Sequence, residues 1–174
     1  MAHIPLIVHF PGAQPRREPA IVQPVDLMPT LLDIAGAPSP ETVQGISVAP
    51  LLRGETIATR DVAITSPTIL HRGAGGCRVT LTTDPATWGR EWAFICAPTA
   101  VQQGETLDRA VDGHAKLERG GLTVPSELYD LGVDPHQEHD VIAQHPDVAA
   151  KLRERLVRAL REMGAAPELV EPWG

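Results

Sequence analysis

The sequence predicts a mixed α/β (α+β) fold in which one strand and one helix precede a small antiparallel sheet with a C-terminal helix. Three observations lead to this prediction. A continuous apolar run at residues 4–10 is typical of a strand that is buried on both faces. Four short strand-like segments follow further along the chain. Residues 146–163 carry the apolar periodicity of a long amphipathic helix.

The composition is that of an ordinary globular protein, with 43% hydrophobic and 21% charged residues among 174. A formal net charge of −7 argues against a nucleic-acid or anionic-membrane partner. No run of 18 apolar residues and no signal-peptide pattern is present, so we expect a soluble protein, cytoplasmic by default, of unknown compartment. Two cysteines, Cys77 and Cys96, cannot build a disulfide framework, and a single bridge between them stays open.

The first predicted elements are the strand at residues 4–10 and a helix at residues 26–35. Pro11 and Gly12 end the apolar run, which favours a strand over a helix. Asp26 has the residue type of a helix N-cap, and Gly36 that of a helix stop. Between them, apolar residues recur at helical spacing at Leu27, Leu31 and Ile34. A two-sided buried strand needs parallel neighbours, and the rest of the sequence offers none.

The later elements predict a small sheet covered by one long helix. The expected strands are residues 61–65, 78–83, 92–97 and 127–131, joined by turns and by a long polar loop over residues 99–125. The expected helix has Pro146 at its start and Gly164 at its end. Its apolar stripe consists of Val148, Leu152, Leu156, Leu160 and Met163.

Three local motifs contain residue types that serve in metal, phosphate or cysteine chemistry. The polar run from Asp134 to Asp140 contains nitrogen and oxygen ligand types, but its spacing does not match H-E-x-x-H and favours a solvated turn. The glycines that follow Arg72 lack the Walker Lys-Ser/Thr and favour a hairpin loop. Cys96 followed by Pro98 is compatible with a buried strand cysteine. No nucleophile–base pair and no metal-ligand set can be assigned.

Three stretches together resemble the C-terminal third of a sulfatase, a member of the alkaline-phosphatase-like superfamily. They are HIPLIV with FPG at residues 3–12, VDLMPTLLDIAG at residues 25–36 with QGIS and LL following, and ELYDL with DP at residues 127–135. Phosphonate monoester hydrolases share parts of this pattern. The resemblance implies that residues 1–58 are the terminal strand and helix of the large α/β sulfatase domain, and residues 59–174 a small C-terminal domain.

The resemblance also implies sulfate-ester hydrolysis by a formylglycine nucleophile with a divalent metal, usually calcium. The formylglycine motif is Cys-x-Pro-x-Arg, whereas this chain has Ala100 after Cys96 and Pro98. The family's metal ligands and its sulfate-contacting lysine precede the strand that corresponds to residues 4–10. We therefore expect no catalytic residue, no metal ligand and no cofactor in this chain, and no activity of the chain alone.

Two function classes follow from these observations. The first is the C-terminal part of a sulfatase-type hydrolase, which forms the core and the rim of the substrate pocket and pairs with an N-terminal sulfatase half, or with another copy, through an exposed sheet edge. The alternatives are a non-enzymatic partner-binding module and a relative of phosphonate or phosphate ester hydrolases. Candidate rim residues are His71 and Arg72, as anion contacts, and Trp88 and Trp92, as ring-stacking groups.

Overall fold

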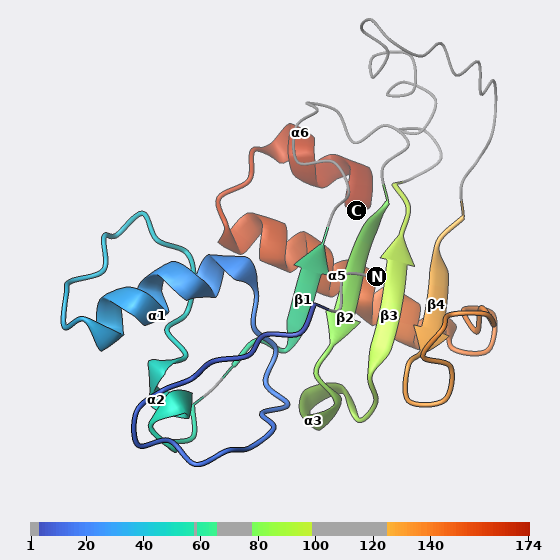
Figure 1. Cartoon of the computed structure of the whole chain (residues 1–174). Helices are drawn as coiled ribbons and strands as arrows, with labels where there is room; N and C mark the ends of the chain where they lie inside the picture. Colours follow the sequence, from blue (N-terminus) through green and yellow to red (C-terminus); the bar gives the residue numbers. More distant parts are fainter. Residues whose placement is uncertain (1–3, 58, 66–77, 99–124) are drawn as a thin grey trace, which may run out of the picture. The chain divides into compact units, whose positions relative to one another are not determined.

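The chain forms two compact units, Met1–Ala63 and Ile64–Gly174. The computed structural model describes residues 4–57, 59–65, 78–98 and 125–174. Figure 1 shows the elements along the chain: the first unit holds two α-helices, and the second holds most of the sheet and the remaining helices. The structure divides after Ala63; the assignment of residues 1–58 to a large α/β domain stays a prediction.

The first unit is built on a short 3-10 turn and two helices. The turn η1 spans Pro24–Asp26 and leads directly into α1, Leu27–Ile34. Gly36 has a φ of 67°, the left-handed conformation that ends a helix, so the predicted helix and its stop are confirmed. The second helix, α2, is one turn long, Ala49–Leu52.

The predicted strand at residues 4–10 is wrong. These residues adopt no regular secondary structure; residues 4–9 are exposed, with Ile7 at 92%, and Phe10 is half-buried. A strand needs neighbouring backbone groups for its hydrogen bonds, and the strands of the described residues begin only at Val62 and pair with one another. Residues 4–10 thus have the composition of a strand, but none of the described strands pairs with them.

The predicted antiparallel sheet is confirmed. Its order is β1-β2-β3-β4, with strands Val62–Thr65, Val79–Thr83, Trp92–Cys96 and Glu127–Asp130. Leu81 lies opposite Phe94, and Phe94 lies opposite Leu128, so three fully buried side chains cross the sheet in one row. A one-turn helix, α3, spans Pro85–Trp88 and connects β2 to β3.

The long helix α5, Pro146–Glu162, covers one face of this sheet and packs on β3 (Figure 1). Leu152 and Leu156, at the centre of the predicted stripe, are fully buried. The end of the stripe is wrong, because Met163 is exposed while Ala149 and Ala159 are buried instead.

After α5 the chain turns back through α6, Pro167–Val170, and a 3-10 turn, η2, Glu171–Trp173. Val170 and Trp173 are buried in this return, so the last residues belong to the core of the second unit. Over the described part of the chain, every helix is too short or too polar to cross a lipid bilayer.

Candidate functional site

A buried carboxylate, Asp26, organises the first unit. Its two oxygens accept hydrogen bonds from the backbone N–H groups of Gln23 and Ile46, both at 2.8 Å. The guanidinium of Arg60 donates to the same carboxylate at 2.5 and 3.2 Å. Asp26 occupies the N-cap position of α1, as the sequence predicts, but its side chain makes no capping hydrogen bond to that helix. It ties three separate segments together instead.

The hydrogen bonds around Asp26 stabilise the ionised form of its carboxyl group. Burial opposes ionisation of the carboxyl, but the hydrogen bonds from Arg60, Ile46 and Gln23 and the charge of Arg60 outweigh it and lower its pKa. A buried carboxylate with four donors is fully occupied by the protein. Its role is to hold the fold rather than to act on a ligand.

The same segments are joined by a second set of contacts along α1. The Thr30 hydroxyl donates to the Asp26 carbonyl at 2.5 Å and accepts from the Val48 N–H at 3.0 Å. The Ser47 hydroxyl donates to the Asp33 carboxylate at 2.7 Å. At Gly45, an added Cβ would lie 1.9 Å from the Val25 carbonyl oxygen, so only glycine fits. Residues 44–47 (QGIS) thus bind to α1 and to the residues just before it, and their role here is structural.

Besides the face that makes these polar contacts, α1 has an exposed apolar face. Leu27, Met28, Leu31 and Ile34 share one side of the helix at a spacing of about one turn, and all are exposed. The buried residues of this helix are Pro29 and Thr30. The amphipathic pattern that predicts the helix is correct, but within this chain its apolar side faces away from the packed residues.

The tryptophan candidates for a substrate rim lie in the second unit. Trp92 is only 4% exposed, at the start of β3, where its ring lies 5.1 Å from the His145 ring and 5.8 Å from the Arg90 guanidinium. Trp88 is half-buried at the end of α3. The structure therefore gives Trp92 a packing role, and a rim role for either tryptophan stays a prediction. His71 and Arg72 lie outside the described residues.

The polar run at residues 134–140 forms a turn. Asp134, Glu138 and His139 place one ligand atom each within 4.8 Å of one another. The Asp134 carboxylate accepts the His139 N–H at 2.8 Å, and backbone hydrogen bonds of this kind lower its pKa. It also organises a loop in which Gln137 has a φ of 58°. The predicted turn is confirmed.

Cys96 ends β3 as a free and fully buried thiol. Burial raises its pKa to about 11, although Arg153 and Ser126 act in the opposite direction. A thiol in this environment is a small apolar residue and not a nucleophile. The interpretation of Cys96 as a buried strand cysteine is confirmed.

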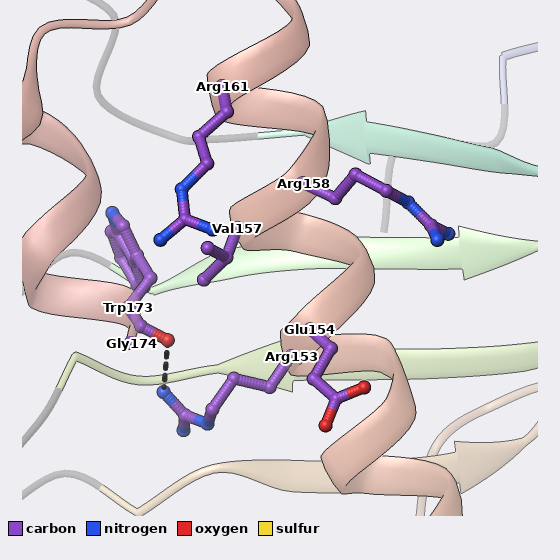
Figure 2. A pocket seen from close by; sticks show the side chains of 7 residues that line it. All are labelled: Arg153, Glu154, Val157, Arg158, Arg161, Trp173 and Gly174. Carbon is purple, nitrogen blue, oxygen red and sulfur yellow. Dashed lines mark hydrogen bonds between the residues drawn. The ribbon is translucent and has the colours of Figure 1, made fainter.

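A pocket of about 240 Å³ lies between α5 and the C-terminal residues (Figure 2). It is lined by Arg153, Glu154, Val157, Arg158, Arg161, Trp173 and Gly174. The sequence analysis missed it. The sequence does indicate one wall of this pocket, because residues 154, 157, 158 and 161 follow the i, i+3, i+4, i+7 spacing of one helix face. The return of the chain at Trp173 could not be read from that spacing.

Both the family model and the curated relatives that match this chain are sulfatases. The family model "N-sulphoglucosamine sulphohydrolase, C-terminal" matches residues 1–64. Arylsulfatase K of Rattus norvegicus is 25% identical over 156 residues, which is 89% of this chain and 24% of the rat protein. The chain thus spans about a quarter of the length of the curated relatives that it matches.

Solved structures show the same fold. A structure concerned with the metabolism of multiple glycosaminoglycans by Bacteroides thetaiotaomicron superposes with a TM-score of 0.62 at 20% identity, over 94% of this chain and 32% of that one. Phosphonate monoester hydrolase from Silicibacter pomeroyi gives a TM-score of 0.52 at 21% identity, over 82% of this chain and 26% of that one. Fold similarity therefore does not separate sulfate esters from phosphonate esters.

Proposed function

Because this chain corresponds to the C-terminal portion of a sulfatase of the alkaline-phosphatase-like superfamily, we propose that it completes a sulfate-ester hydrolase whose catalytic groups lie on a separate portion. Its first unit would pack against that catalytic portion. Its second unit would carry part of the pocket rim. The hydrolysis itself would depend on residues that these 174 positions do not supply.

The observation that carries this proposal is the exposed apolar surface of the first unit. Ten of the thirteen exposed large hydrophobic residues in the described part of the chain lie in this unit. They are Ile4, Leu6, Ile7, Val8, Val25, Leu27, Met28, Leu31, Ile34 and Ile46, named here the unit-1 apolar set. Contiguous exposed apolar residues, such as those that share one side of α1, mark protein contact surfaces. The unit-1 apolar set falls within residues 1–64, which the sulfatase family model matches.

The same proposal accounts for residues 4–10. Their composition is that of a strand buried on both faces, yet they have no strand partner here. In the complete enzyme the catalytic portion would supply parallel neighbours, and this run would become a strand of the large sheet. The partner through this segment would then be a sulfatase catalytic portion.

The residues present do not fit the groups that the family's reaction requires. Cys96 is buried with a raised pKa and is followed by Ala100 in place of arginine, which does not suit a formylglycine precursor. At the turn of residues 134–140, the Asp134 carboxylate is occupied by backbone N–H groups, which does not suit a calcium ligand. Formylglycine and the metal would therefore belong to the catalytic portion.

The experiment that tests the proposal compares the chain alone with the chain and its catalytic portion. The coding sequence upstream of codon 1 is first searched for an in-frame Cys-x-Pro-x-Arg stretch. The portion that contains it is then co-expressed with this chain, and aryl sulfate and aryl phosphonate hydrolysis are measured with calcium. We expect a complex that hydrolyses the sulfate ester and no turnover by the chain alone. Turnover by the purified 174-residue chain would refute the proposal.

A matched pair of variants tests the contact surface. Leu31 is 66% exposed in the unit-1 apolar set, whereas Leu169 is 47% exposed in the second unit. We expect Leu31→Asp to weaken complex formation by at least about tenfold, because a charge would be buried without a partner. Leu169→Asp should leave complex formation unchanged. Equal effects of the two substitutions would argue against the unit-1 apolar set as the contact.

A non-enzymatic partner-binding module is the second candidate, and the same exposed surface favours it. The two differ in what the complex does. A stable complex with the catalytic portion that shows no ester hydrolysis would favour the module. Preference for the aryl phosphonate would favour the phosphonate hydrolase relatives.

A further inference from the structure

One side of α1 is polar, and it is held by residues that follow later in the first unit. Asp26, Pro29, Thr30 and Asp33 lie on this side, at the i, i+3, i+4, i+7 spacing of one helix face. The three polar side chains bind residues 46–60, where the partners are Ile46 and Arg60 for Asp26, Val48 for Thr30, and Ser47 and Arg53 for Asp33. The helix is thus fixed from its polar side.

A helix as short as α1 needs this support to form in the free chain. It has eight residues, whereas isolated helices below roughly 12–15 residues are marginal in water. Its apolar side adds little burial, because Leu27, Met28, Leu31 and Ile34 are between 41% and 66% exposed. The polar contacts therefore keep α1 formed, and its apolar side is presented to solvent in a fixed arrangement.

Residues 4–10 are apolar as well, but they lack such support. They have no regular secondary structure, and none of the described strands pairs with them. A run that is apolar on both faces is typical of a strand in a parallel sheet, and such a sheet carries helices on its faces. A strand and the helix that follows it can therefore bury their apolar sides against the same sheet.

We propose that α1 is a preformed docking helix for the catalytic portion, and that residues 4–10 form strand pairs only when that portion is bound. This inference rests on the proposed function and deepens it, because it gives the two parts of the unit-1 apolar set different roles. The partner follows from the comparisons, since the chain spans about a quarter of its sulfatase relatives and matches a C-terminal family model. A preformed helix costs less conformational entropy on binding than a segment that must be ordered.

Amide hydrogen exchange, measured on the full chain alone and in the co-expressed complex, tests this difference. The amides of Ala35 and Val48 report on α1, because they donate to the Leu31 carbonyl and the Thr30 hydroxyl, both at 3.0 Å. We expect both amides to be protected already in the chain alone, where residues 6–10 should exchange like an unstructured peptide. In the complex, exchange at residues 6–10 should slow by at least about a hundredfold.

A matched pair of arginine variants tests whether the polar contacts prepare α1 for docking. Arg60→Gln removes a guanidinium from Asp26 in the first unit, and Arg90→Gln removes one from Asp130 in the second. We expect Arg60→Gln to weaken complex formation by about tenfold, because α1 would then have to be ordered on binding, and Arg90→Gln by less than about twofold. In the Arg60→Gln chain, the Ala35 amide should lose protection and regain it in the complex.

The outcomes separate this inference from the proposed function. A complex in which residues 6–10 stay unprotected, or a free chain in which the Ala35 amide exchanges as fast as residues 6–10, would overturn the inference alone. Equal weakening by the two arginine variants would do the same. Protection of residues 6–10 in the chain alone, rising with its concentration, would identify a second copy as the partner and also overturn it. Absence of any complex would refute the proposed function, and this inference with it.

Discussion

The two units of this chain treat their apolar residues in opposite ways. In the second unit, sixteen apolar residues of the described chain are buried, and α5 and the sheet enclose them. In the described part of the first unit the buried apolar residues are Pro29, Val48, Ala49, Leu51 and Val62, and the unit-1 apolar set is exposed. The first unit is held instead by polar contacts around Asp26. The second unit thus encloses a core of its own, whereas the first unit leaves most of its large apolar side chains exposed.

The largest expected difference between the units comes from one substitution made on two helices. Leu152→Ala on α5 removes a fully buried side chain, which should lower the free energy of unfolding by about 2–5 kcal/mol. Leu31→Ala on α1 removes an exposed one and should change it by less than about 0.5 kcal/mol. Urea denaturation followed by tryptophan fluorescence and circular dichroism measures both. Similar losses for the two variants would show that the first unit has a core of its own.

The second prediction concerns the polar contacts that replace a core in the first unit. Asp26→Asn keeps the shape of the side chain but leaves Arg60 without its buried partner. We expect a loss of about 3 kcal/mol in the stability of this unit. Amide hydrogen exchange at Ile46 and Val48 should accelerate accordingly, while exchange in β3 stays unchanged. Acceleration in β3 as well would show that the units unfold together.

The smallest expected effect is a pH dependence confined to the first unit. The lowered pKa of Asp26 means that its contribution is complete above the ordinary carboxyl pKa of about 4 and is lost as the pH falls through the lower folded value. The Ile46 amide, which donates to this carboxylate, should titrate with a midpoint below 3.8 in an NMR pH series. Asp26→Asn should abolish that titration. A midpoint above 3.8 would contradict the assigned network.

The sequence by itself determined the local elements. The four strands, the helix at residues 26–35 and the helix at residues 146–163 were predicted close to their observed bounds, because alternation, helical periodicity and the end signals at Gly36 and Pro146 act over a few residues. The sequence also resembles sulfatases at residues 25–36 and 44–47, and the structure joins these two stretches through the contacts of Asp26 and Gly45. The pocket on α5 was missed because its second wall, Trp173 and Gly174, is placed by a turn of the chain after α5 that helical spacing does not specify.

Only the tertiary structure decided what each element packs against. The apolar runs at residues 4–10 and on α1 predict burial, and both are exposed here, because burial requires a second surface that local sequence does not specify. The same chemistry is buried on α5, where a sheet from the same chain covers it. A pattern of side chains fixes which face of an element is apolar, and the rest of the folded protein decides whether that face meets a core or water.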